Sequence, residues 1–284
     1  MRLGLFAINM NVCADVAVGA DIARAAEAAG FDSVWTGEHV VLPDPQAPPS
    51  PAAPLTPMLD PGVALAFIAA RTNTIKLGTG IIILPQRNPL VLGKEMASLD
   101  VASNGRLIVG VGAGYLQAEF DALHAPFDDR GRRVEDALSA MRAIWEMDAP
   151  SHDGPYWSFS SVQANPRPLQ RPIPIVMGGH GEGAYSRSVR LCQGWYGFGL
   201  NPERAKNSID ALASAAARFE RPAELGRLEI SVTPPPVPLT PDTVDAYRAM
   251  GVDRLVILPR GTATKDDLLS LIDSSVAAVK ACAK

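Results

Sequence analysis

The sequence predicts a (β/α)8 TIM barrel, an α/β fold in which eight parallel strands alternate with helices, with loop insertions at the C-terminal face. Eight apolar segments that favour strands alternate with eight that favour helices, and 284 residues suit a fold that typically takes about 250. The links from a helix to the next strand are short, and glycines collect where strands end. Because no linker divides the chain, we expect one domain over residues 1–284.

The first half of the chain supplies four strands separated by three helices. The expected strands are 3–8, 31–36, 75–84 and 106–112, and the expected helices are 15–29, 61–71 and 89–102. In the first helix Ile22, Ala26 and Ala29 share one face, and Gly30 follows where a C-terminal glycine cap belongs. Pro89 suits the first turn of the third helix.

The second half completes the barrel less evenly. The expected strands are 173–177, 195–198, 228–232 and 255–258, and the expected helices are 130–147, one from 182 toward 194, 202–219, 240–250 and 265–280. Asn201 and Pro202 make a good helix start, with asparagine as the cap and proline in the first turn. Residues 148–172 are irregular, with a small hairpin expected at 156–159.

The third strand carries the most informative stretch of the sequence. Ile81, Ile82 and Ile83 are β-branched, which favours a strand buried on both faces. Gly78 and Gly80 lie just upstream, and a glycine in a strand gives nothing to pack. Such a glycine usually marks a bulge or a place where a ligand lies flat on the backbone.

Composition narrows the class of function. The net charge is −4 and no basic cluster is interleaved with aromatic residues, so we expect no nucleic-acid partner. Cys13, Cys192 and Cys282 form neither a CxxC pair nor a disulfide framework, which fits a reducing cytoplasm. The apolar runs fall short of the roughly 20 residues of a membrane span. We therefore expect a cytoplasmic protein that acts on a small molecule and has no membrane partner.

In a barrel of this type the chemistry lies at the C-terminal ends of the strands. The residues expected there are Asn9, Glu38, His39, Gly80, Ile81, Gly112, Ala113, Gly114, Tyr115, Gly178, Gly179, His180, Gly199, Leu200 and Arg260. Three of these strand ends are rich in glycine, which suits a flat ring and a phosphate more than a metal. The helix that opens at Glu182, after a glycine-rich turn, offers an anion site at its N-terminus. His39, beside Glu38, suits proton handling.

Other site classes lack their motifs. The glycines at 110–114 do not complete a dinucleotide fingerprint, because its third glycine would fall at Tyr115. The four histidines have no metal-ligand spacing, and there is no HExxH. The chain also contains no GxSxG nucleophile elbow and no GKS or GKT phosphate loop. We expect no metal site.

The ordered set of motifs resembles the luciferase-like monooxygenase superfamily, and within it the branch of deazaflavin (coenzyme F420) dependent oxidoreductases. The segments that carry the resemblance are 29–35 with Glu38 and His39, 77–81, 104–107 leading to 110–115, 119–120, 129–133, 172–179 and 194–195. They cover most of the chain, and they are specific only as a set.

The resemblance implies a flavin-like ring at the C-terminal mouth of the barrel, and a cis peptide bond at Gly80–Ile81 in a bulge that supports one face of the ring. It implies an acid or base role for His39, and we expect His39 and Tyr115 to be the catalytic residues. The implied cofactor-binding residues are Glu38, His39, Gly80, Ile81, Gly112, Gly114, Gly178, Gly179 and His180. Tyr115 stands where related sugar-phosphate dehydrogenases carry an acid, which argues against a sugar-phosphate substrate.

The function implied is hydride transfer between coenzyme F420 and a small organic substrate. An FMN-dependent monooxygenase, a non-catalytic flavin-binding protein of the same fold and an unrelated phosphate-binding barrel remain as alternatives. Four cations near strand ends are candidates to meet the anionic tail of F420: Arg87, Arg130, Arg187 and Arg260. The proline-rich loop 43–57 is expected to border the substrate pocket and to be mobile. We also expect a homodimer.

Overall fold

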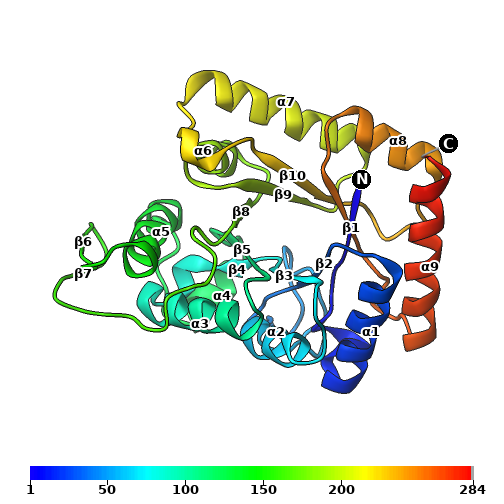
Figure 1. Ribbon diagram of the computed structural model, residues 1–284, viewed down its shortest axis with the longest axis horizontal. Coiled ribbons are helices and arrows are strands. Elements are labelled where there is room, and N and C mark those ends of the chain that lie inside the picture. The colour runs from blue at the N-terminus through cyan, green and yellow to red at the C-terminus, as the bar shows by residue number, and fades with distance from the viewer. Residues whose placement is uncertain (283–284) are drawn as a thin grey trace.

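The computed structural model describes residues 1–282, and within them eight parallel barrel strands close on themselves, as predicted (Figure 1). The strands are β1 (Arg2–Leu5), β2 (Ser33–Thr36), β3 (Lys76–Thr79) with its continuation β4 (Ile82–Ile83), β5 (Leu107–Gly112), β8 (Ile175–Gly178), β9 (Gly194–Phe198), β10 (Glu229–Thr233) and β11 (Arg254–Ile257). β1 pairs with β11, and β3 and β4 pair with β5, so the sheet has no free edge.

Helices surround the barrel at nearly the predicted bounds. They are α1 (Val16–Ala29), α2 (Pro61–Ala69), α3 (Pro89–Ala102), α5 (Arg130–Glu146), α6 (Glu182–Leu191), α7 (Pro202–Arg218), α8 (Pro241–Ala249) and α9 (Lys265–Ala281). The caps are those expected: the Asn201 side chain accepts a hydrogen bond from the Arg204 amide, and Gly30 is left-handed with φ 89°. A further helix, α4 (Gln117–Ala122), is not predicted by the sequence.

Two layers of apolar side chains form the core. The larger lies between the barrel and the helices, and the smaller, which contains the aromatic residues Phe6, Trp35 and Tyr196 beside aliphatic ones, lies in the barrel interior. Trp35 of β2 stacks on Tyr196 of β9 with ring centroids 5.3 Å apart. At the N-terminal ends of the strands, the guanidinium of Arg254 lies 5.6 Å from the Trp35 ring. Side chains therefore fill the barrel interior toward the N-terminal ends of the strands, and the open space lies at the C-terminal ends.

The break between β3 and β4 is a bulge. Gly78 pairs with Ile108 and Ile82 pairs with Val111, so the broken strand uses one residue more than β5 over the same length. The Gly80–Ile81 peptide bond inside this bulge is cis, as predicted. A Cβ on Gly110 would lie 1.9 Å from the Thr79 carbonyl oxygen, so this close approach requires glycine on β5.

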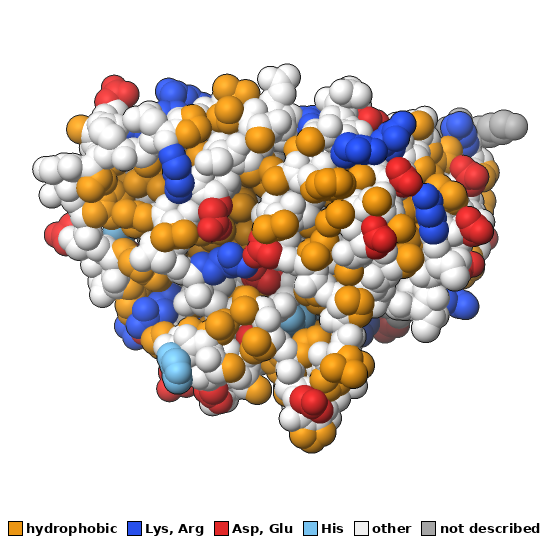
Figure 2. Space-filling view, turned by 90° about the horizontal axis from the view of Figure 1, so that it is seen from below, with side chains coloured by type: hydrophobic (Ala, Val, Ile, Leu, Met, Phe, Trp, Pro, Cys, Tyr) orange, Lys and Arg blue, Asp and Glu red, His pale blue; other side chains and the backbone are white. Residues whose placement is uncertain are grey.

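Two irregular insertions leave the barrel. Residues 43–57 contain no helix or strand, and a two-stranded hairpin, β6 (His152–Asp153) with β7 (Ser158–Phe159), lies near the segment expected to hold one. Charges of both signs are interspersed over the face shown in Figure 2. Among the helices of residues 1–282, none has the length and apolar character needed to span a bilayer.

Candidate active site

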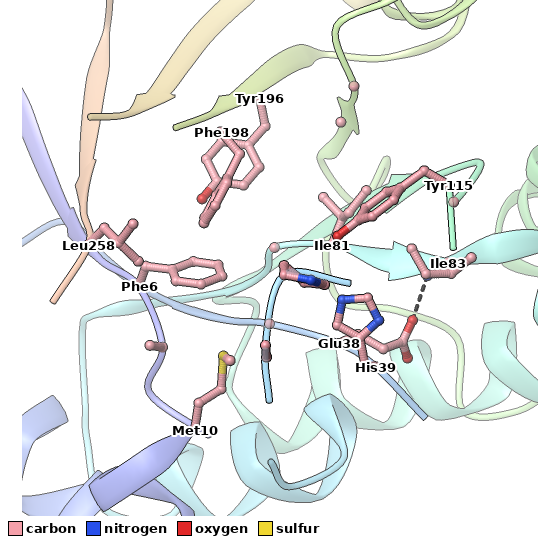
Figure 3. A pocket seen from close by; sticks show the side chains of 18 of the residues that line it. Phe6, Met10, Glu38, His39, Ile81, Ile83, Tyr115, Tyr196, Phe198 and Leu258 are labelled. Carbon is pink, nitrogen blue, oxygen red and sulfur yellow. Dashed lines mark hydrogen bonds between the residues drawn. The ribbon is translucent and has the colours of Figure 1, made fainter. Parts of the chain in front are cut away.

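A cavity of about 1140 Å³ lies at the C-terminal ends of the strands (Figure 3). Its volume exceeds that of a site for one drug-sized ligand, so it has room for a cofactor and a substrate together. Most of the predicted site residues line it: Glu38, His39, Gly80, Ile81, Gly114, Tyr115, Gly178, Gly179 and His180. Gly112 does not line the cavity. It lies beneath the Ile81 side chain, because a Cβ on Gly112 would stand 2.1 Å from Ile81 Cδ1.

The bulge presents the Ile81 side chain to the cavity. The neighbouring strands carry glycine at the positions that contact this side chain. Gly112 of β5 and Gly178 of β8 both lie against the Ile81 side chain. A Cβ on Gly178 would stand 2.7 Å from Ile81 Cδ1. The two glycines leave space for the isoleucine, which becomes an apolar platform at the centre of the cavity (Figure 3).

His39 and Tyr115 face the cavity close to this platform. The His39 ring meets the Tyr115 ring edge-on, with centroids 6.2 Å apart. His39 Nδ1 lies 3.2 Å from Glu119 Oε2, and the Val40 amide donates to Glu119 Oε1 at 2.6 Å. The sequence therefore identifies the histidine but misses its partner, since Glu119 stands on the short helix α4.

The environment of these groups shifts two pKa values. Burial acts to raise the pKa of Glu119, but hydrogen bonds from His39 and the Val40 amide, with the charge of His39, hold it below its usual value. Burial raises the pKa of Tyr115, and the nearby charge of Glu119 adds to that effect. At neutral pH the imidazole of His39 therefore has a carboxylate, that of Glu119, and a neutral phenol, that of Tyr115, as neighbours.

Glu38 contributes to the cavity wall mainly by holding the backbone in place. Its carboxylate accepts from the Ile83 amide (Figure 3). It also accepts from Arg87, which in turn bonds to Asp60 at 3.0 Å. Burial raises the pKa of Glu38, and the charge of Arg87 opposes this. Arg87, expected to meet a cofactor tail, is instead held between these acids and does not line the cavity.

Asn9 is fully buried behind the cavity wall. Its amide oxygen accepts from the Gly37 amide, and its Nδ2 donates to the carbonyls of Gly37 and Leu59. This strand-end residue therefore joins the segment that carries His39 to the end of the long proline-rich loop.

One end of the cavity is suited to an anion. The N-termini of α5 and α6 both reach it, and neither has a side-chain cap. At α5 the amides of Arg130 and Arg132 already donate to backbone carbonyls, so the free amides there are fewer than at α6; free amides at a helix N-terminus favour negative charge. The cations Arg130 and Arg187 line the same end, and Arg187 also pairs with Glu135 at 3.1 Å. Gly179, with φ +121°, precedes α6 and presents bare backbone. His180 accepts from the Phe198 amide, and burial together with the charge of Arg204 lowers its pKa.

The opposite wall is apolar, and the sequence does not predict it. Phe6, Met10, Phe198 and Leu258 stand on this side, across from His39 and Tyr115 (Figure 3). The rings of Phe6 and Phe198 lie 5.0 Å apart. Arg260 lines the rim beyond them and is exposed. Within residues 1–282 no group of three or more His, Cys, Asp and Glu side chains could hold a metal ion.

The loop 43–57 borders the cavity through Pro51, Ala52 and Thr56, as predicted. It contains seven prolines, which cannot donate backbone hydrogen bonds, and it forms few bonds of its own. We expect its amides to exchange with solvent much faster than those of β5 or β8, and to slow when a ligand fills the cavity. Hydrogen exchange followed by mass spectrometry measures both. Protection in the free protein equal to that of the barrel strands would contradict the expectation.

Comparison with known proteins adds sequence and fold relationships to this geometry. A family model described as luciferase-like monooxygenase matches residues 1–257. The oxygenase component of a flavin-dependent trigonelline monooxygenase of Acinetobacter baylyi is 30% identical over 158 residues, which are 55% of this chain and 41% of that protein. The chain therefore spans less than half of that relative, and 64% of the next curated relatives.

Solved structures share the fold along the whole chain. Monooxygenase RslO1 from Streptomyces bottropensis has a TM-score of 0.78 at 21% identity and covers 100% of both chains. An F420-dependent secondary alcohol dehydrogenase, in complex with an F420-acetone adduct, also has a TM-score of 0.78, at 16% identity, and covers 99% of this chain and 98% of its own. At these identities the likeness shows the barrel and its closure.

Proposed function

Since the chain belongs to the luciferase-like monooxygenase family, we propose that it is an oxidoreductase that transfers a hydride between coenzyme F420 and a small organic substrate. The observation that carries the proposal is the position of His39. A buried carboxylate holds its imidazole beside the Ile81 platform, so a proton-handling group stands where a flat ring and a substrate would meet.

The cavity fits the cofactor in three parts. The platform of Ile81, with Gly112 and Gly178 against it, suits one face of a flat ring. The uncapped N-termini of α5 and α6, with Arg130 and Arg187, suit a phosphate. Arg260 at the exposed rim suits the longer anionic tail that distinguishes F420 from FMN.

The chain's own residues supply orientation and proton transfer. When bound, the cofactor supplies or accepts the hydride. His39 takes the proton of a substrate hydroxyl as the alcohol is oxidised, and returns a proton to the oxygen in the reverse direction. The apolar wall of Phe6, Phe198 and Leu258 holds the carbon part of the substrate and excludes water. Orientation of this kind is worth several kcal/mol of barrier.

The test is a parallel fluorescence titration of the purified chain with F420 and with FMN, followed by turnover with short secondary alcohols. We expect tighter binding of F420 and loss of the absorbance of oxidised F420 on addition of substrate. Binding of FMN without affinity for F420 would overturn the cofactor assignment. Tight binding of F420 without turnover of any substrate would instead indicate a cofactor-binding protein.

A second candidate is an FMN-dependent monooxygenase, favoured by a sequence relationship. The 30% identical relative from Acinetobacter baylyi is named as a flavin-dependent monooxygenase. The same platform and anion end suit FMN, whose phosphate lies at the end of a shorter tail. Oxygen consumption by the chain with reduced FMN and a substrate would support this candidate over hydride transfer to a carbonyl.

The platform gives a prediction that applies to either cofactor. In Gly112→Ala the new methyl group meets Ile81 Cδ1, so the isoleucine moves toward the ring site. Overpacking costs about 1–3 kcal/mol, and we expect roughly tenfold weaker cofactor binding from it. Ile81→Val removes Cδ1, so the double variant should regain most of the affinity. A Gly112→Ala protein that binds both cofactors like the wild type would show that Ile81 does not support the ring.

A further inference from the structure

We propose that Glu119 is a positioning residue that fixes the tautomer of His39, so that the neutral imidazole always presents an unprotonated Nε2 to the cavity. The inference rests on the proposed function, since it assigns the protonation state that His39 needs for proton transfer. Its structural part, the tautomer itself, can be tested without any cofactor.

The two oxygens of Glu119 have separate partners. Oε1 accepts from the Val40 amide at 2.6 Å, which fixes the orientation of the carboxylate. Oε2 lies 3.2 Å from His39 Nδ1. The Glu119 side chain is 2% exposed and the His39 side chain 10%, so water does not compete readily for this contact. Because an ionised carboxylate only accepts hydrogen bonds, Nδ1 must carry the proton.

The consequence for chemistry follows from the proton count of the ring. A neutral imidazole with its proton on Nδ1 has a lone pair on Nε2, so it accepts a proton from a substrate hydroxyl. The two electrons of the broken C–H bond leave with the hydride to the oxidised cofactor, the O–H electrons form the C=O bond, and the proton stays on His39. Glu119 then faces an imidazolium and stabilises it. The other tautomer would point an N–H at the hydroxyl and could not accept its proton.

The chain contains a matched pair that has no access to the cavity. His152 Nε2 lies 2.8 Å from Asp136 Oδ1, and Asp136 Oδ2 accepts from the amides of Tyr156 and Trp157. Asp136 is also buried, but His152 stands on the hairpin β6–β7 and does not line the cavity. The pair has the same construction and no place in the proposed reaction, so it serves as a control.

The test is Glu119→Gln, which reverses the donor without removing the contact. The Val40 amide requires the glutamine oxygen on its side, so the glutamine NH2 faces Nδ1 and forces the His39 proton onto Nε2. Nitrogen-15 NMR of the imidazoles in the free protein distinguishes the two tautomers, and His39→Asn assigns the His39 signals by their loss. We expect the Nδ1–H form in the wild type and the Nε2–H form in Glu119→Gln. Asp136→Asn should change only the signals of His152.

Kinetics provide the second readout. In Glu119→Gln we expect kcat to fall about 100-fold while KM and the dissociation constant of the cofactor stay within about twofold, because only proton transfer is impaired. Asp136→Asn should leave kcat unchanged. An Nε2–H tautomer in the wild type, or an unchanged tautomer in Glu119→Gln, would overturn the proposal. A wild type that carries the Nδ1–H tautomer but turns over no substrate would overturn the proposed function and leave the positioning by Glu119 intact.

Discussion

His39→Asn is expected to lower kcat by about 10²–10⁴-fold, the usual contribution of a general acid or base. The asparagine NH2 group can occupy a position close to that of Nδ1, so the hydrogen bond to Glu119 and the segment around Val40 should persist. The amide cannot exchange a proton with the substrate near neutral pH. The loss should therefore appear in kcat and not in cofactor binding.

The measurement is the initial rate with F420 and a secondary alcohol, beside a cofactor titration and a thermal melt of the same protein. His124→Asn is a suitable control, because His124 does not line the cavity. It should retain the wild-type rate. A His39→Asn enzyme with kcat within a factor of three of the wild type would assign the proton transfer elsewhere, with Tyr115 as the next group to test.

The largest effect on stability is expected at the other end of the barrel, in Arg254→Met. The Arg254 side chain is 1% exposed, and it donates to Asp32 Oδ2 at 2.8 Å and to Ser231 Oγ at 3.0 Å, as well as to Glu229. Removing one partner of a buried pair typically costs about 3–5 kcal/mol, because the remaining charge stays without compensation. Lys76 and Arg2 still reach the two acids, so we expect about 3 kcal/mol.

Urea unfolding at neutral pH measures this loss, with Arg227→Met as the control. Arg227 pairs with Asp253 on the same face, but its side chain is 69% exposed, so its removal should cost less than about 1 kcal/mol. Equal losses in the two variants would contradict the importance of burial for the Arg254 pair.

The ion pair between Arg254 and Asp32 also makes the free energy of unfolding depend on pH in the acid range. Burial acts to raise the pKa of Asp32, but the charge of Arg254 and then that of Lys76 hold it below the unfolded value. The folded pKa lies below the unfolded one, so the stabilising contribution is full above the unfolded value of about 3.9 and is lost as the pH falls through the folded pKa. Arg254→Met should therefore lose less stability than the wild type between neutral pH and pH 3.

The fold was largely predictable from local chemistry. Caps such as Gly30 and Asn201 set helix ends within a residue, and glycines at 78 and 80 pointed to the bulge in the third strand. Helix caps and strand glycines act on residues close to them in the sequence. The strand–helix unit that contains them is repeated around the barrel. The proline-rich loop was likewise recognisable from its composition.

The partners of the site residues were harder to predict, since they depend on distant contacts. Glu119 meets His39 from 80 positions away, on a helix of six residues without a capping side chain. The sequence places Arg87 near a strand end, where a cation could bind a ligand, yet its guanidinium pairs with Glu38 and Asp60. The apolar wall of Phe6 and Phe198 forms only when the first and sixth barrel strands face each other. A single sequence contains no local pattern for such pairs.

The extra residue at the bulge also changes the phase of side-chain alternation along the third strand. Leu77 and Ile82 both pack in the outer core against the helices, although an even spacing would be needed to put both on one side of a regular strand. Ile81 and Ile83 consequently face the cavity. A deletion of one residue here would restore a continuous strand in which Leu77 and Ile82 stand on the same side at an even spacing. Ile82 and Leu84 would remain in the outer core, but Ile81 would lose the bulge that presents its side chain at the centre of the cavity.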